Sequence, residues 1–352
     1  MNILHISPDF NYACGVSKHV YLLLKYWKKE FPKDNLYFIT NGGDSLERLE
    51  KINVTYKKIK LKRGSKNILL LIRNLFSLLI FCKRNKIEII HTHHRQAELL
   101  AYIISILTKV KTITTVHSFV EGKKHLSFLS DKIIAVSNSV KCNLIEKFAV
   151  DEMKISVIYN FIEPIDIEQA VTENEVFKQL DSKKIFLFAG RISYIKGCDI
   201  LIESFGKISK VRKDLHLVLI GKWELENDSN KLTENITYIK SVNSIKDYLF
   251  KSFCVILPSR LDPFPFLMLE AGLAVRPFIG GRTSGIQEFI EDGKDGLLVE
   301  SGNVNDLINN IFQIADDKNL AKKLAENLYK KVMPLTNYKK YLQNIRIIYE
   351  EK

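Results

Sequence analysis

The sequence has few cysteines, and their arrangement indicates neither a disulfide framework nor a zinc site. The five cysteines are odd in number and scattered between residues 14 and 254. None belongs to a Cys-x-x-Cys pair or has a histidine at the spacing of a zinc ligand. Such usage suits a reducing compartment, and we expect a cytoplasmic protein.

Signals for secretion and for membrane insertion are also missing. Residues 1–8 lack the basic start and small-residue cleavage site of a signal peptide and have the pattern of a buried strand. The most apolar run, Ile68 to Cys82, is interrupted by Arg73 and Asn74. It is also shorter than the roughly 20 apolar residues that cross a bilayer. The sequence therefore predicts no membrane-spanning helix.

Acidic residues are scarce in the first half of the chain. Residues 1–161 hold 26 Lys and Arg against 13 Asp and Glu, and the rest holds 27 of each, so the net charge of +13 lies in the first half. The stretch 51–87 has no acidic residue, and its basic residues flank the apolar run. Two interpretations stay open: peripheral contact with anionic lipid at the inner face of the plasma membrane, or a solvated basic face around a buried helix. No nucleic-acid motif accompanies the charge, so we expect no nucleic-acid partner.

The sequence is rich in short apolar runs that alternate with helical patterns. The runs typical of buried strands are 3–6, 36–40, 87–92, 112–117, 132–136, 185–189, 216–220, 236–239, 254–257, 275–279 and 296–299. The clearest helical patterns are 16–30, 98–107, 199–209 and 304–315. This alternation predicts an α/β protein with parallel sheets covered on both faces, and 352 residues suggest two domains.

The domain boundary is predicted in an acidic stretch without a buried strand, residues 160–181. We therefore expect domains over 1–164 and 165–334. A helix over 335–352 is left over after the second sheet closes.

A first candidate site follows the strand predicted at 185–189. Gly190 and Gly197 bracket a turn that carries Arg191 and Lys196, and a helix is predicted to begin near Cys198. Ligands of such folds bind beyond the carboxyl ends of the strands, where helix amino termini attract anions. Two cations there suit a diphosphate leaving group. The alternative is a pair of surface cations at a helix start.

A second stretch, which we interpret as the other half of the same site, follows the strand predicted at 254–257. Pro263 and Pro265 suit a helix start, which would put Asp262 at its amino end and Glu270 about two turns in. Their backbones would be roughly 10 Å apart, longer than the 5 to 5.5 Å or so between the carboxylates of a retaining glycosidase. Such a spacing favours carboxylates that hold two different sugars of one ligand. A helix cap is the alternative for Asp262.

These two stretches resemble motifs of the bacterial family-4 (group 1) retaining glycosyltransferases, and the likeness extends over nearly the whole chain. Gly190-Arg191 with Lys196-Gly197 is similar to the family's diphosphate motif. Residues 258–271 are similar to its Glu-x7-Glu segment, with Asp262 in place of the first Glu. The resemblance implies the GT-B fold, in which two doubly wound Rossmann-like domains have parallel sheets facing a central cleft. The acceptor side would be 1–164, the nucleotide-sugar side 165–334, and the last helix would pack back on the first domain.

The resemblance also implies an activity. A sugar, typically a hexose, would pass with retention from an NDP-sugar, with a UDP-sugar favoured, to a glycan or lipid-linked saccharide of a surface polysaccharide such as capsule or lipopolysaccharide. Arg191 and Lys196 would contact the diphosphate, Glu270 the ribose and Asp262 the transferred sugar. Gly190, Phe266 and Leu267 complete the donor site expected in the second half. No metal or other cofactor is expected.

In the first half the resemblance implies further site residues. Gly15, whose backbone would approach the donor phosphate and the acceptor, follows the opening strand, with Cys14 where the family often has a second glycine. His117 matches a position whose histidine contacts the transferred sugar near the reaction centre, and we count it with Arg191, Lys196 and Asp262 as catalytic. His93 and Arg95 are predicted to line the acceptor cleft.

A metal interpretation of the histidine-rich stretch 88–94 is disfavoured. Alternate histidines on a strand point the same way, but no third ligand follows at a convincing spacing. We therefore predict no metal site.

Other functions fit parts of the pattern. A GT-B sugar-nucleotide epimerase would need the same diphosphate site plus acid-base carboxylates near the sugar, and a non-catalytic partner subunit would bind nucleotide without transferring sugar. A nicotinamide dehydrogenase is disfavoured, because no Gly-x-Gly-x-x-Gly follows an early strand.

Overall fold

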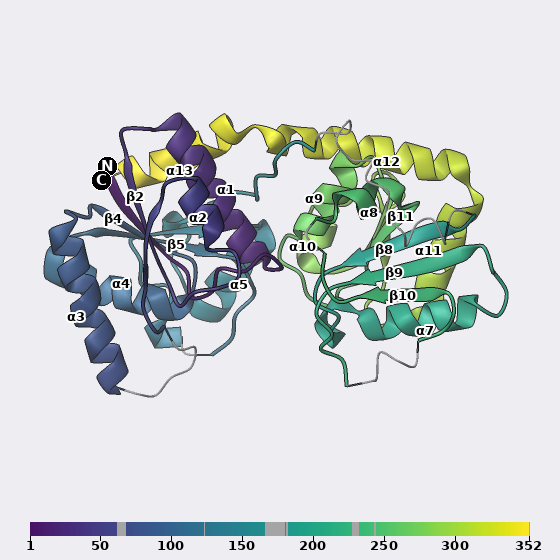
Figure 1. Ribbon diagram of the computed structural model, residues 1–352, viewed down its shortest axis with the longest axis horizontal. Coiled ribbons are helices and arrows are strands. Elements are labelled where there is room, and N and C mark those ends of the chain that lie inside the picture. Colours follow the sequence, from purple (N-terminus) through teal and green to yellow (C-terminus); the bar gives the residue numbers. More distant parts are fainter. Residues whose placement is uncertain are drawn as a thin grey trace. The chain divides into compact units, whose positions relative to one another are not determined.

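The computed structural model describes residues 1–61, 68–122, 124–165, 180, 182–226, 232–242 and 244–351. It consists of two compact units, each a sheet flanked by helices (Figure 1). The first unit comprises Met1–Phe161 and Asn337–Lys352, and the second comprises Ile162–Thr336. The boundary between the two units falls after Phe161, whereas the sequence pattern predicted it after residue 164. Much of the predicted linker, including 166–179, lies outside the described residues.

The first unit is built on a parallel sheet with the strand order β3-β2-β1-β4-β5-β6-β7. Its strands are β1 (Asn2–Ile6), β2 (Asn35–Thr40), β3 (Thr55–Lys58), β4 (Ile89–Thr92), β5 (Lys111–Val116), β6 (Lys132–Ala135) and β7 (Ile155–Val157). Its helices are α1 (Gly15–Glu30), α2 (Glu47–Lys51), α3 (Ile68–Arg84), α4 (Arg95–Thr108), α5 (Asn138–Phe148) and α13 (Tyr338–Glu350). Short 3-10 turns, η1 (Lys124–Leu126) and η2 (Glu152–Lys154), complete it.

The second unit has a parallel sheet with the order β10-β9-β8-β11-β12-β13. Its strands are β8 (Lys184–Ala189), β9 (Leu215–Ile220), β10 (Ile236–Ile239), β11 (Cys254–Leu257), β12 (Phe278–Gly281) and β13 (Leu297–Val299). Its helices are α7 (Cys198–Ile208), α8 (Lys246–Lys251), α9 (Phe266–Leu273), α10 (Ser284–Gln287), α11 (Val304–Asp316) and α12 (Lys318–Val332). The 3-10 turns η3 (Tyr194–Lys196) and η5 (Met333–Thr336) belong to it as well.

Both sheets reverse their strand order at one place, between β1 and β4 in the first and between β8 and β11 in the second. In open α/β sheets, ligands bind outside the carboxyl ends of the strands at this reversal. The fold therefore points to the loops after β1 and β4 and to those after β8 and β11.

Strands that the sequence pattern missed or misplaced have local physical causes. The edge strand β3 is mostly exposed and carries two lysines, so it has no apolar run. The strand predicted at 275–279 begins only at Phe278. Val275 has a φ of 53°, and the Arg276 amide donates to the Ala271 carbonyl at 2.9 Å, which extends the end of α9 into those positions.

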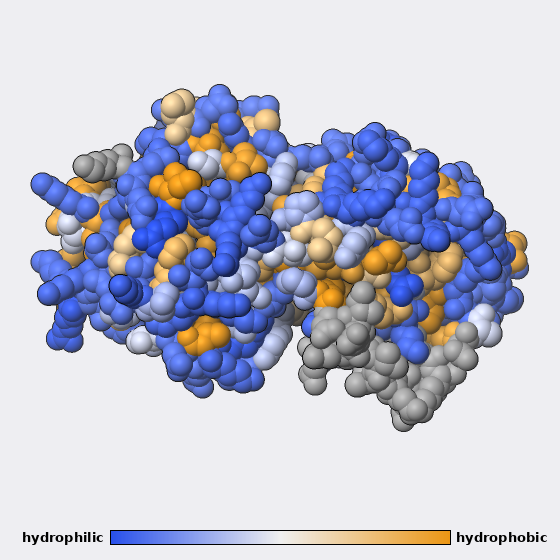
Figure 2. Space-filling model, turned by 90° about the horizontal axis from the view of Figure 1, so that it is seen from above, coloured by the Kyte–Doolittle hydropathy of each residue, from blue (hydrophilic) through white to orange (hydrophobic). Residues whose placement is uncertain are grey.

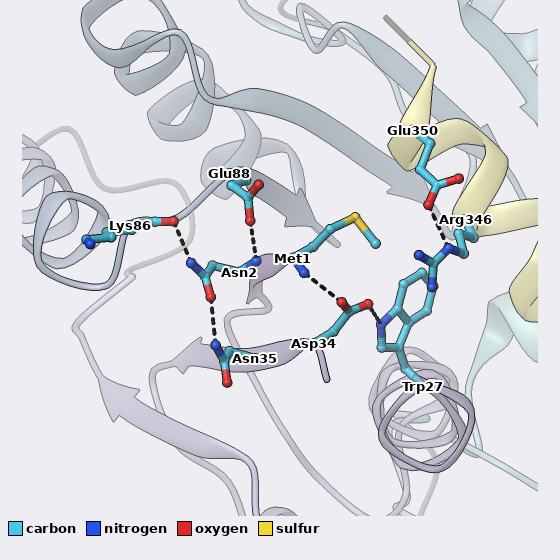
Figure 3. Close-up of polar contacts among 9 residues, drawn as sticks. All are labelled: Met1, Asn2, Trp27, Asp34, Asn35, Lys86, Glu88, Arg346 and Glu350. Atoms are coloured by element: carbon cyan, nitrogen blue, oxygen red, sulfur yellow. Dashed lines mark hydrogen bonds and ion pairs between the residues drawn. The ribbon is translucent and has the colours of Figure 1, made fainter. Parts of the chain in front are cut away.

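The start of the first sheet is tied down by polar contacts (Figure 3). The Met1 ammonium lies 2.6 Å from Asp34 Oδ1, and Trp27 Nε1 of α1 donates to Asp34 Oδ2 at 3.1 Å. The Asn2 amide donates to Glu88 Oε2 at 2.7 Å, just before β4. These contacts fix β1 between its neighbours and hold α1 against the sheet.

The helix predicted over 335–352 spans Tyr338–Glu350 as α13 and belongs to the first unit, where it contacts α1. An ion pair between Arg346 and Glu350, 2.7 Å apart, supports its last turn. The ring of Tyr349 lies 4.9 Å from that of Trp27.

The apolar run 68–82 lies within α3. Leu78 and Cys82 are buried in the core that α3 shares with α4. In the described part of the chain, no helix is both long and apolar enough to cross a membrane. Figure 2 shows a face covered mostly by hydrophilic residues, with apolar residues in small separate groups.

Candidate functional site

The two stretches predicted to form one site in the second unit lie against each other. β8 and β11 are neighbours, and the Arg260 amide donates to the Ile195 carbonyl at 2.8 Å. Gly197 has a φ of 70°, and a Cβ at this position would lie 2.0 Å from the Pro258 carbonyl oxygen. Only glycine allows this approach without a clash, so Gly197 lets the first stretch close on the second.

Lys196 and Asp262 form the charged centre of this site. The Lys196 ammonium is paired with Asp262 Oδ2, and the Ser259 hydroxyl lies 3.4 Å from the same oxygen. Asp262 is only 3% exposed, so these contacts compensate for burial of its charge. Asp262 does not cap α9, because the residue at the cap position is Pro265.

Arg191 is the exposed cation of the site. It follows Gly190, which leaves β8 with a φ of 155°. Its side chain is 56% exposed and lies 3.5 Å from Glu224, which also pairs with Lys222 at 3.1 Å. Glu224 was not among the predicted site residues. Its position in the loop after β9, at the same edge of the sheet, was the available signal.

Arg260 of the second stretch bonds to residues that flank Lys196 in the first and so holds the two stretches together. This role was not predicted from the sequence. The Arg260 guanidinium donates two hydrogen bonds to the Asp199 carboxylate of α7, at 2.6 and 2.7 Å, and one to the Tyr194 carbonyl. It also stacks 3.7 Å from the Tyr194 ring. The bonds to Asp199 raise the pKa of Arg260 above its usual value, so its charge is secure.

Glu270 lies closer to the start of its helix than predicted. Because α9 begins at Phe266, Glu270 is its fifth residue, just over one turn in rather than two. Phe266 and Leu267 open the helix, whose first-turn N–H groups have no acceptor within the helix. Both residues and Glu270 therefore lie at a helix start that suits an anionic ligand.

Gly15 occupies the corresponding place in the first unit. It is the first residue of α1, it is exposed, and it follows Cys14, whose side chain makes no capping bond. The amino end of α1 follows β1, at the strand reversal of the first sheet.

A cluster of histidines occupies the same edge of the first sheet. It holds five of the eight histidines in the chain: His5 on β1, His19 on α1, His91 on β4, and His93 and His117 just after β4 and β5. His5 Nδ1 lies 3.2 Å from His93 Nε2, and His93 Nδ1 lies 3.1 Å from His117 Nε2. His93 thus has both ring nitrogens engaged within the cluster, and two other members have both engaged by side chains outside it.

His91 and His19 are the members held on both sides by residues other than histidine. His91 lies 2.6 Å from the Tyr349 hydroxyl and 2.7 Å from the Thr115 hydroxyl. His19 lies 3.0 Å from Asn160 Oδ1 and 3.3 Å from the Tyr341 hydroxyl. Through the two tyrosines, α13 contributes to the cluster.

Histidines from other elements lie beside those of residues 88–94, which the spacing along the sequence did not indicate. Ligand atoms of His5, His91 and His93 lie within 4.8 Å of one another, as do those of His19, His93 and His117. The first triad gains His5 from β1, and the second gains His19 from α1 and His117 from just after β5. None of these three histidines lies at the spacing of a metal motif from residues 88–94.

Burial keeps the cluster uncharged. It lowers the pKa of His5 to about 3 and that of His19 to about 4. The pKa values of His91, His93 and His117 are also well below the usual value, first through burial and then through neighbouring histidines. All five imidazoles are therefore neutral at pH 7.

His93 and Arg95, the two residues predicted to line the acceptor cleft, both make contacts within the first unit. His93 is only 4% exposed and contacts its histidine neighbours. Arg95 donates to the carbonyls of Glu121 and Gly122 at 2.9 and 3.0 Å and thereby supports the loop after β5. Contact of either residue with an acceptor stays a prediction.

Two family models match the chain, one on each unit. The model described as Glycosyltransferase Family 4 matches residues 13–165, and the one described as Glycosyl transferases group 1 matches 171–331. The chain is a group 1 glycosyltransferase of family 4. The predicted family is confirmed, and the glycosyltransferase motifs named above fall within the matched ranges.

Curated relatives extend over most of the glycosyltransferase. An uncharacterized glycosyltransferase of Methanocaldococcus jannaschii is 26% identical and covers 100% of this chain and 98% of its own. The UDP-Gal:alpha-D-GlcNAc-diphosphoundecaprenol alpha-1,3-galactosyltransferase of Escherichia coli is 26% identical, with 79% of each chain covered.

Solved structures confirm the predicted GT-B fold with two Rossmann-like domains. A glycosyltransferase from Rickettsia africae has a TM-score of 0.82 at 22% identity and covers 99% of this chain and 97% of its own. An Anabaena protein crystallised with UDP and glucose has a TM-score of 0.82 at 16% identity, with 99% of each chain covered.

Proposed function

We propose that this glycosyltransferase transfers a sugar, with retention of configuration, from a UDP-sugar to a lipid-linked or other saccharide acceptor in the synthesis of a surface glycan. The observation that carries the proposal is the placement of Lys196, Asp262 and Arg191 together at the strand reversal of the second sheet. The E. coli relative uses UDP-Gal and a diphosphoundecaprenol-linked acceptor, and the Anabaena structure holds UDP and glucose, which supports the choice of substrates.

The charges suit departure of a nucleoside diphosphate. Negative charge grows on the diphosphate as its bond to the sugar breaks, and a cation fixed beforehand stabilises that charge without reorganisation. Asp262, which also accepts a hydrogen bond from Ser259, holds Lys196 in such a fixed position, while the exposed Arg191 can close on the phosphate oxygens. We propose that these two cations supply the positive charge, and that no metal ion or other cofactor is required.

The carboxylates then have separate tasks. We propose that Glu270 accepts hydrogen bonds from the ribose hydroxyls and that Asp262 accepts one from the transferred sugar. Neither acts as a nucleophile. The acceptor attacks from the side of the leaving group, and the departing phosphate helps to remove its proton. His117 would contact the transferred sugar.

We expect Arg191→Ala and Lys196→Ala each to lower kcat by about 10²- to 10³-fold, the usual loss for one preorganised stabiliser of transition-state charge. The measurement is UDP release from a panel of UDP- and GDP-sugars, with and without saccharide acceptors. Lys213→Ala is the matched control, because Lys213 is an exposed cation of the same unit that precedes the amino end of β9. Near wild-type turnover of Arg191→Ala would contradict the assignment.

The same assay separates the alternatives. A sugar-nucleotide epimerase would convert UDP-GlcNAc to a second UDP-sugar without any acceptor. A non-catalytic partner subunit would bind UDP but neither hydrolyse nor transfer the donor.

We further propose that α3 brings the enzyme to anionic membranes, where a lipid-linked acceptor would lie. Leu69, Ile72, Phe76 and Ile80 follow a helical spacing along α3, and their exposed fractions are 79, 44, 61 and 49%. Exposed cations flank this apolar face: Lys57, Lys58, Arg73, Lys83 and Arg84. An apolar stripe bordered by cations is typical of helices that lie in the headgroup region. Lys62, Arg63 and Lys66, which we counted in this basic surface, lie outside the described residues.

We expect the enzyme to float with liposomes that contain anionic lipid at low salt, and replacement of Leu69 and Phe76 by Ser to abolish flotation. Each apolar side chain contributes about 1.5 to 3 kcal/mol on burial, and each nearby cation about 1 kcal/mol. Met153→Ser is the matched control, since Met153 is 83% exposed and lies on η2 of the same unit. Failure of the wild type to float at low salt would count against the membrane contact.

A further inference from the structure

Three of the buried histidines form a chain of hydrogen bonds that ends at the predicted catalytic histidine. His5 Nδ1 meets His93 Nε2 at 3.2 Å, and His93 Nδ1 meets His117 Nε2 at 3.1 Å. His5 is fully buried and His93 is 4% exposed, whereas His117 is half-buried. The hydrogen-bonded row of histidines thus runs from the buried His5 to His117, whose ring is the closest of the three to solvent.

Neutral imidazoles allow only two proton arrangements along this chain. Each ring carries one N–H donor and one acceptor nitrogen, so the direction of one hydrogen bond dictates the next. Either all three rings are protonated on Nδ1, or all three are protonated on Nε2. In the first arrangement His117 offers an Nδ1–H donor beyond the chain, and in the second it offers a bare Nδ1.

The surroundings of His5, the innermost of the three histidines, favour one of the two proton arrangements. His5 Nε2 is buried and has no hydrogen-bond partner among the described residues. With protons on Nδ1 this atom is an acceptor without a donor, and with protons on Nε2 it is a buried N–H without an acceptor. Among buried backbone groups, donors without an acceptor are rarer than acceptors without a donor, and we apply the same preference to this ring nitrogen. The first arrangement is therefore favoured.

A metal ion is the competing occupant of this cluster, because nitrogen contacts of 3.1 to 3.2 Å also suit two ligands of one zinc ion, whose Zn–N bonds are about 2.0 to 2.1 Å. Each of the two triads among the described residues, however, includes a histidine whose two nitrogens already bond to side chains other than histidine. His91 is held by Tyr349 and Thr115, and His19 by Asn160 and Tyr341. Metal binding would have to break one of these hydrogen bonds, whereas the row of hydrogen bonds from His5 to His117 leaves all of them intact.

We propose that His5 and His93 are positioning residues that fix His117 as a neutral Nδ1–H donor toward a substrate oxygen, such as a sugar hydroxyl. His117 then binds through its N–H and does not act as a general base. The kinetic consequence rests on the proposed glycosyl transfer, but the protonation pattern does not, because it is a property of the enzyme without substrates.

The first test is the tautomer of each ring in the intact enzyme. In protein labelled with 15N-histidine, the shifts of the two ring nitrogens distinguish Nδ1–H from Nε2–H, and single substitutions such as His117→Asn assign the signals. We expect His5, His93 and His117 all to carry the proton on Nδ1 at pH 7.5. A His117 signal of the Nε2–H form overturns the proposal, as do zinc at a stoichiometric level in the purified enzyme and ring signals that change when EDTA is added.

The second test separates positioning from a merely structural role. We expect His93→Leu to release His117 into a mixture of tautomers and to lower kcat about tenfold, with the KM for donor changed less than about threefold, as for the loss of one hydrogen bond. In His93→Asn the amide nitrogen can take the place of Nδ1, and we expect it to restore the tautomer and most of kcat. His125→Asn is the control, since His125 is exposed on η1.

A fall in kcat while His117 of His93→Leu keeps a pure Nδ1–H signal overturns the proposal. If His93→Leu does not fold, the His117 tautomer in the wild type and in His93→Asn still tests the proposal. In that case an Nε2–H signal for His117 in either protein overturns it.

Discussion

Gly197→Ala should destabilise the second unit by about 2 to 5 kcal/mol and abolish detectable UDP binding. A left-handed conformation costs a residue with a Cβ about 1 to 2 kcal/mol, and forcing extra atoms into a packed site costs about 1 to 3 kcal/mol. Both terms apply, because Gly197 has a φ of 70° and its Cβ would lie 2.0 Å from the Pro258 carbonyl oxygen. That carbonyl is backbone and cannot rotate away, so the two stretches must separate. Urea unfolding and calorimetry with UDP measure the two effects.

The chain offers a matched control for the backbone term. Gly293 has a φ of 74°, and a Cβ there would meet no atom within 4 Å. Gly293→Ala should therefore cost only the left-handed term, about 1 to 2 kcal/mol, and leave UDP binding intact. Equal losses of stability and binding in the two variants would contradict the view that close approach at Gly197 assembles the site.

The sequence could predict the turn and the helix start that follow β8 because its signals are local. Gly190 and Gly197 mark the turn after β8, and the helix start near Cys198 follows directly. The strand order could not be read from the pattern, and neither could the pairing of Lys196 with Asp262. That pairing depends on β8 and β11 being neighbours although about 70 residues separate them in the chain.

The start of the helix that carries Glu270 was predicted too early, for a local reason. Prolines at 263 and 265 suggested a helix that begins near Asp262, but the cap residue is Pro265, with a ψ of 136°, and the helix begins after it. The residue before a proline avoids the helical region, which delays the helix past Phe264. Glu270 is therefore one turn in.

The histidine cluster needed information that no local pattern contains. His5 pairs with His91 in the register of β1 and β4, and His93 and His117 follow neighbouring strands. Each histidine alone has the pattern of an ordinary residue of a buried strand or helix. Only the strand order β1-β4-β5 makes them neighbours, and their common burial then lowers their pKa values.

We expect the first unit to lose stability steeply as the pH falls from 7 to 5. The pKa of His5 is about 3 and that of His19 about 4 in the folded protein, below the 6.5 or so of an unfolded histidine. Below pH 6.5 the unfolded chain binds protons that the folded unit excludes, so the free energy of unfolding decreases. The loss is about 1.4 kcal/mol per pH unit for each such histidine, hence about 2 kcal/mol each at pH 5. His91, His93 and His117 shift in the same direction and add to it.

The pH window identifies the histidines as the cause. In the first unit, burial raises the pKa of the Glu98 carboxyl, so its protonation favours the folded state as the pH falls and does not contribute to the loss. The chain has two tryptophans, Trp27 in the first unit and Trp223 in the second, so in Trp223→Phe the fluorescence of Trp27 reports the first unit alone. In that background, His5→Gln should reduce the difference in unfolding free energy between pH 7 and pH 5 by about 2 kcal/mol, because one excluded proton is removed. Replacing the exposed His125 by Gln should leave the difference unchanged. A wild-type unfolding free energy that is flat over this range would mean that the cluster takes up protons in the folded state, which its burial forbids.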